Sequence, residues 1–109
     1  MEAKELYLKI ASEVTDGHEI VSSQMFGMPT LKVRGKAFAG LRGEVMAFKL
    51  GPDDLAAANT LPGAAPFDPS GMGRAMGGWV QVGTAGQGEW KRLAEQALKF
   101  VAATATKKK

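Results

Sequence analysis

The sequence lacks cysteine and has a single histidine, His18, among its 109 residues. Without cysteine, the chain has no disulfide scaffold, thiolate zinc site, iron–sulfur cluster or cysteine nucleophile. One histidine cannot complete a multi-histidine metal site, and its place in the segment Asp16-Gly17-His18 is typical of a solvated turn. We therefore predict no bound metal and no cofactor.

Long apolar runs are also missing, because no stretch approaches the ~18 consecutive apolar residues that a membrane-spanning helix needs. The first ten residues, MEAKELYLKI, are charged and amphipathic, unlike a secretory signal. Hydrophobic residues make up 45% of the chain and charged residues 23%, the balance of a globular domain. These observations predict one cytoplasmic domain with no membrane partner.

The net charge of +3 comes from the last three residues, Lys107, Lys108 and Lys109. Without them, eleven basic residues balance eleven acidic ones, so the basic character belongs to the terminus and not to the fold. We predict a single domain over residues 1–103, followed by a flexible basic tail over 104–109.

Hydrophobic periodicity predicts an α+β fold. Spacings of three and four residues indicate a helix over 2–15 and a final helix that begins at Trp90, and Gly51-Pro52 opens a short helix between them. Alternating residues, glycine turns and an aromatic segment indicate strands near 19–25, 29–34, 36–42, 44–50 and 79–82. The expected architecture has two layers, an antiparallel meander sheet with the helices on one face. The segment 62–78 is expected to be a long loop that is functional or mobile.

Catalytic patterns are weak throughout the chain. Asp53 and Asp54 lie at a helix start, where they suit the helix dipole, and no pair of carboxylates is predicted to converge. The glycine-rich segment 71–78 precedes a strand and lacks the lysine and hydroxyl residue of a P-loop. We predict no catalytic residue and no enzymatic activity. Arg74, the loop's only cation, remains a candidate anion contact.

The densest basic group on the predicted fold is Lys32, Arg34 and Lys36, which Arg42 and Lys49 could join across the meander. Such a row can contact phosphates, and a solvated sheet face is the favoured alternative. The candidate contacts to nucleic acid or another anion are therefore Lys32, Arg34, Lys36, Arg42, Arg74, Lys107, Lys108 and Lys109.

Met72 and Met76 lie in the glycine-rich loop next to the strand that begins at Trp79. Methionine side chains repack readily against varied surfaces, so exposed methionines favour an adaptable contact. Met72, Met76 and Trp79 are therefore the candidate residues for a partner surface or cleft.

Several short motifs occur in a recognisable order. They are Met25-Phe26-Gly27, Gly35-Lys36-Ala37-Phe38-Ala39, Met46-Ala47-Phe48-Lys49, Pro66-Phe67, the strand at Trp79 and the final helix. Over residues 4–101 this series resembles the TfoX N-terminal domain family (TfoX/Sxy), with the YjbR/MmcQ family as the close second. Both resemblances imply a secretion-chaperone-like α+β architecture.

The resemblance and the residue patterns together give three functional hypotheses, in order of preference. The first is a non-enzymatic regulatory or interaction module, linked to bacterial transcription or competence, that acts with a protein partner or as a homodimer. The second is a YjbR-like protein that binds DNA weakly through charge. The third is a small-ligand binder that uses the loop 62–78. We expect the homodimer to form through the fifth strand or the open sheet face.

Overall fold

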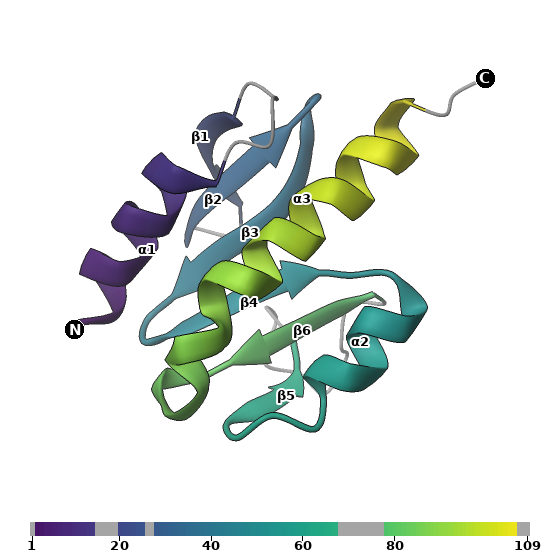
Figure 1. Cartoon of the computed structure of the whole chain (residues 1–109). Coiled ribbons are helices and arrows are strands. Elements are labelled where there is room, and N and C mark those ends of the chain that lie inside the picture. The colour runs from purple at the N-terminus through teal and green to yellow at the C-terminus, as the bar shows by residue number, and fades with distance from the viewer. Residues whose placement is uncertain (1, 15–19, 26–27, 68–77, 107–109) are drawn as a thin grey trace.

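The computed structural model describes residues 2–14, 20–25, 28–67 and 78–106 (Figure 1). The helices are α1 (Ala3–Glu13), α2 (Pro52–Ala58), the 3-10 helix η1 (Thr84–Glu89) and α3 (Trp90–Thr106). The strands are β1 (Ile20–Met25), β2 (Met28–Val33), β3 (Lys36–Arg42), β4 (Val45–Lys49), β5 (Ala64–Pro66) and β6 (Trp79–Val82).

All six strands form one antiparallel sheet with the order β1-β2-β3-β4-β6-β5. Helices α1 and α3 cross the same face, which we call the helix face, and the opposite side is the second face (Figure 1). The predicted two-layer α+β fold with an antiparallel meander is therefore confirmed. Helix α3 continues to Thr106, past residue 104 at which the tail was expected to begin.

The segment 62–78 contains a strand that the sequence did not predict. Residues Ala64–Pro66 form β5 and pair with β6, and Phe67 is fully buried beside them. The expectation of a continuous loop was therefore wrong for this part. Three residues that end in proline give no alternating pattern, so the strand exists only because β6 lies alongside it.

The main hydrophobic core lies between the helix face and the helices. Helix α3 contributes Trp90, Leu93, Ala97, Leu98 and Val101, all at most 1% exposed. Their spacing of three and four residues places them on one stripe of the helix, as the sequence predicted.

Local irregularities shape the β2–β3 hairpin. Arg34 and Gly35 form its turn with positive φ values of 53° and 80°, as two-residue hairpin turns of type I′ require. Farther along, Leu31 pairs with Ala39 and Lys32 with Ala37, so Phe38 is an extra residue in β3. This β-bulge directs both Phe38 and Ala39 into the main core.

A smaller apolar cluster occupies the second face. Met28, Ala47, Phe67 and Trp79 are its buried members, and Ala37 packs against them. The rings of Phe67 and Trp79 lie 5.7 Å apart and are tilted by 40°. Phe67 directly follows β5 and Trp79 begins β6. The contact between their rings therefore holds β5 and β6 together on the second face, in addition to their backbone pairing.

Candidate nucleic-acid interface at the basic end of the sheet

The predicted basic residues Lys32, Arg34 and Lys36 meet at the β2–β3 turn. Arg34 and Lys36 are exposed and Lys32 is half-buried. Arg34 belongs to the turn, because β2 ends at Val33 and Arg34 has a positive φ. The expectation that Arg34 continues the strand beyond Lys32 was therefore wrong.

The pairing register separates Lys32 from Lys36. Lys36 pairs with Val33, whose side chain lies in the main core, so Lys36 belongs to the helix face. Lys32 pairs with Ala37, which packs on the second-face cluster. Side chains of directly opposed residues point to the same side of a sheet. These cations therefore surround the end of the hairpin and do not form a row on one face.

Lys49 joins this group, as the sequence suggested. It is the last residue of β4 and pairs with Trp79, which places it on the second face. Its Nζ lies over Gly78, so close that a Cβ added to this glycine would be 3.1 Å from it. We name Lys32, Arg34, Lys36 and Lys49 the basic end.

Arg42 lies apart from the basic end. It is the last residue of β3, whereas Lys36 is the first. Because a strand rises about 3.3 Å per residue, the two are separated by roughly 20 Å. The idea that Arg42 joins the other cations across the meander was wrong, because antiparallel connection carries it to the opposite end of the sheet.

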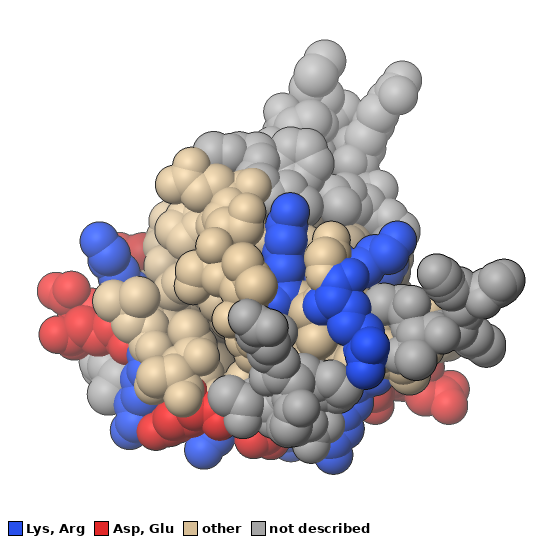
Figure 2. Space-filling view, turned by 90° about the horizontal axis from the view of Figure 1, so that it is seen from above, with Lys and Arg blue, Asp and Glu red and all other residues tan. Residues whose placement is uncertain are grey.

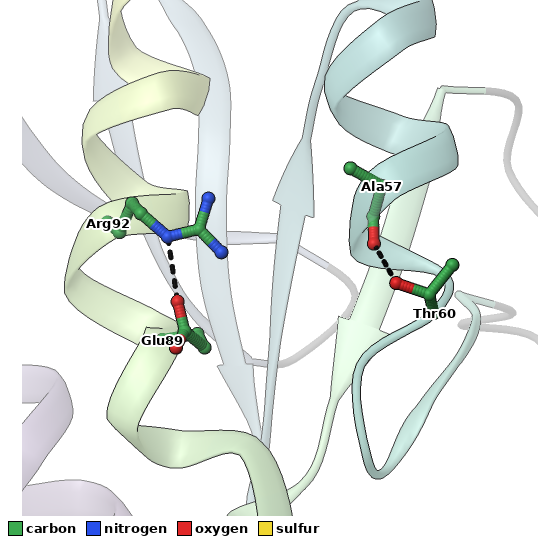
Figure 3. A network of polar contacts seen from close by, with 4 residues as sticks. All are labelled: Ala57, Thr60, Glu89 and Arg92. Carbon is green, nitrogen blue, oxygen red and sulfur yellow. Dashed lines mark hydrogen bonds and ion pairs between the residues drawn. The ribbon is translucent and has the colours of Figure 1, made fainter.

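The ion pairs found among the described residues lie away from the basic end. Lys91 Nζ is 3.3 Å from Glu13 Oε1, and Arg92 Nε donates to Glu89 Oε1 at 2.7 Å (Figure 3). Within the described ranges, no ion pair includes a member of the basic end.

Figure 2 looks onto this end of the molecule. A group of Lys and Arg side chains occupies its middle, and the Asp and Glu side chains lie toward its edges.

Figure 3 also shows how α2 ends. The Thr60 hydroxyl donates a 2.7 Å hydrogen bond to the backbone carbonyl of Ala57. Asn59 Nδ2 donates similarly to the carbonyl of Leu55, at 3.0 Å. The backbone N–H groups of Asn59 and Thr60 also donate to the carbonyls of Leu55 and Ala57, so the polar groups here are explained by the local structure of the helix end.

The other predicted contact residues divide into two groups. Trp79 is only 6% exposed, as a buried member of the second-face cluster. The remaining candidates lie outside the described residues, and these are Met72, Met76, Arg74, Lys107, Lys108 and Lys109.

An open depression of about 450 Å³ lies at the end of the sheet that holds the β3–β4 turn. Its lining residues are Glu2, Ala3, Lys4, Gly43, Glu44, Thr84 and Gln87. None of them belongs to segment 62–78, and charges of both signs occur together. The depression therefore does not support a ligand site built on that segment.

Metal-binding and membrane-spanning features were searched over the same described residues. They contain no group of three or more His, Asp or Glu residues that could hold a metal ion. Nor does any helix in the described ranges have the length and apolar character needed to cross a bilayer.

Comparison of the chain with models of known protein families, with curated proteins and with solved structures finds no match. The chemistry of the site therefore rests on its own geometry.

Proposed function

We propose that this protein is a non-enzymatic regulatory interaction module whose basic end contacts the phosphate backbone of nucleic acid. The observation that supports this is the gathering of Lys32, Arg34, Lys36 and Lys49 at one end of the sheet without an acidic partner among the described residues. The proposal includes a cytoplasmic, bacterial setting of the kind that the TfoX-like motif series implies.

Binding of this type is carried by charge. Each lysine or arginine that reaches a phosphate releases condensed counterions, and this release gives an affinity that falls steeply with salt. The tip of a hairpin that presents cations on both sides suits an irregular groove edge or a flexible strand. The C-terminal end of α3 lies at the same end of the molecule, so its exposed Lys99 adds to the positive potential there (Figure 1).

Neither long helix is free to read base edges in a groove. Sequence-specific proteins usually insert a helix or a two-stranded ribbon into the major groove. Here α1 and α3 direct their apolar stripes into the main core, and the aromatic side chain of Trp79, which pairs with Lys49, is buried. We therefore propose weak binding that is insensitive to sequence.

The test measures the salt dependence of binding to labelled mixed-sequence duplexes by fluorescence anisotropy. Four phosphate contacts correspond to a log–log slope of roughly −3.6, to which the lysines at 107–109 add. The double variant Lys36→Gln with Lys49→Gln should make the slope shallower by roughly 2. A variant that lacks residues 107–109 measures separately how much of the salt slope the tail contributes.

The matched control is Lys4→Gln with Lys9→Gln, two exposed lysines of α1. This variant has the same net charge as the first and should keep the wild-type slope. Equal losses in both double variants would show that net charge, and not the basic end, carries the binding. Tight binding to one sequence at physiological salt would contradict the proposal in another way, because it would require base readout.

A further inference from the structure

Of the two edge strands formed by the described residues, β1 is the long one. In the strand order, β1 and β5 are outermost, while the Trp79 strand β6 lies between β4 and β5. That strand therefore offers no unpaired edge for the expected dimer contact, since β4 and β5 pair with its two sides. Strand β5 has only three residues and ends in Pro66, features that blunt an edge.

Strand β1 lacks the usual protection of an edge. Its sequence, IVSSQM, contains no charged residue, proline or glycine over six residues. Its backbone pairs with β2 on one side in an unbroken register from Ile20↔Val33 to Met25↔Met28. Alternate residues of such a strand direct N–H and C=O groups away from the sheet, where they are available to another strand.

The side chains of β1 are also exposed. Val21 is 50% exposed, and only Leu8 is a second large exposed hydrophobic residue among those described. Ser22 and Gln24 are exposed as well, and Ser23 is half-buried. The edge therefore combines outward main-chain groups, the exposed apolar side chain of Val21 and the neutral side chains of Ser22, Ser23 and Gln24.

We infer that β1 pairs antiparallel with β1 of a second copy of this chain, about a two-fold axis at Ser22. This register pairs residues 20–24 of the two copies. Each residue lies opposite a residue whose side chain is on the same face of the sheet, because paired residues are an even number of positions apart in the sequence. Val21 then lies opposite Ser23 of the second copy. The two six-stranded sheets become one continuous sheet with an isologous interface.

A second copy fits this edge better than a charged partner would. The strand is neutral, so two copies bring no like charges together although each chain has a net charge of +3. A basic or acidic peptide would find no complementary charge on β1. The small side chains of Ser22 and Ser23 at the centre of the strand allow two backbones to approach to the usual spacing of about 4.8 Å.

The first test uses the absence of cysteine from the chain. In the proposed register, Ser22 lies directly opposite Ser22 of the second copy. The Cα separation of directly opposed residues, about 4.5–5.5 Å, is within the range for a disulfide. Under mild oxidation the variant Ser22→Cys should form a linked dimer within minutes and in high yield. Ser12→Cys, an exposed serine of α1, is the matched control and should remain mostly unlinked.

The second test is the mass in solution by light scattering at tens of micromolar protein. The wild type should give twice the 11.5 kDa of one chain, and Val21→Lys should give the single mass with its circular dichroism and melting unchanged. A wild-type mass of one chain, or equal cross-linking of the two cysteine variants, would overturn the inference. If Val21→Lys does not fold, the comparison of cross-linking between Ser22→Cys and Ser12→Cys still tests the inference. Neither readout depends on nucleic-acid binding, so this inference and the proposed function can fail separately.

Discussion

The indole Nε1–H of Trp90 donates a 3.0 Å hydrogen bond to the backbone carbonyl of Val82. Trp90 is the first residue of α3 and Val82 the last residue of β6, and both side chains are fully buried. Helix η1 lies between them in the chain. The bond therefore closes this connection and fixes where α3 begins on the sheet.

Replacing Trp90 by phenylalanine should destabilise the fold by about 2–4 kcal/mol. The change removes a buried hydrogen bond, which contributes about 0.5–1.5 kcal/mol, and it also leaves a cavity where the larger indole was. Urea denaturation followed by the fluorescence of Trp79, the one remaining tryptophan, measures the free energy of unfolding. A loss below about 0.5 kcal/mol would show that Val82 finds another donor.

Replacing Trp79 by alanine should cost about 3–5 kcal/mol, the range for a large buried side chain. Trp79 is 6% exposed and contacts Phe67, so its removal opens the second-face cluster. Phe67→Leu, a smaller change in the same cluster, should cost less. Thermal denaturation of the wild type, Trp79→Ala and Phe67→Leu compares their stabilities. A neutral Trp79→Ala would instead identify Trp79 as a residue that acts at a partner surface.

Replacing Arg34 by asparagine should stabilise the fold by up to about 1 kcal/mol. Arg34 has a φ of 53°, a conformation that arginine adopts at a cost and that asparagine tolerates, and Gly35 already follows it. Chemical denaturation should show a higher midpoint with an unchanged slope. Arg34→Val is the opposing control and should destabilise, because a β-branched residue is strained at positive φ. Stabilisation by both variants would refute the strain argument.

The stability of the fold should fall in strongly alkaline solution because of Tyr7. Burial raises the pKa of Tyr7 from 10.0 to about 12. The folded state thus holds this proton more tightly than the unfolded state does, so the contribution is complete below pH 10. It is lost as the pH rises through 12. A shift of this size corresponds to roughly 3 kcal/mol at most.

The measurement for Tyr7 is the difference in unfolding free energy between wild type and Tyr7→Phe across pH 8.5–11.5. The difference should move in favour of the variant as the pH rises, because phenylalanine cannot ionise. Every other side chain is the same in both proteins, so effects of pH that do not involve Tyr7 cancel in the difference. A difference that stays constant with pH would contradict the burial of the phenol.

Much of the fold was predictable because its signals are local. The alternation before Gly35 and the apolar stripe after Trp90 each occupy one continuous segment, and the strand at Trp79 was placed with the correct bounds. Strand β5 was not predictable, because its three residues become a strand only through pairing with β6. Local patterns carry no information on which distant segment will lie alongside.

The basic end was predictable in composition but not in geometry. Lys32, Arg34 and Lys36 are adjacent in the sequence, so their gathering at a hairpin was expected. Their distribution over two faces depends on the register, and the distance to Arg42 depends on the direction of β3. Neither can be derived from residue spacing alone, because both follow from the pairing of strands.

The extra residue Phe38 sets the phase of the whole strand β3. Lys36 and Phe38 both lie on the helix face. If the alternation continued unbroken past Phe38, then Gly40 and Arg42 would also point at the helices, and Leu41 would point away from them. With the bulge, Leu41 enters the main core and Arg42 remains exposed. The chain length between residues 36 and 42 is thus under a stricter constraint than the identity of most side chains there. A gain or loss of one residue would exchange the inner and outer sets together.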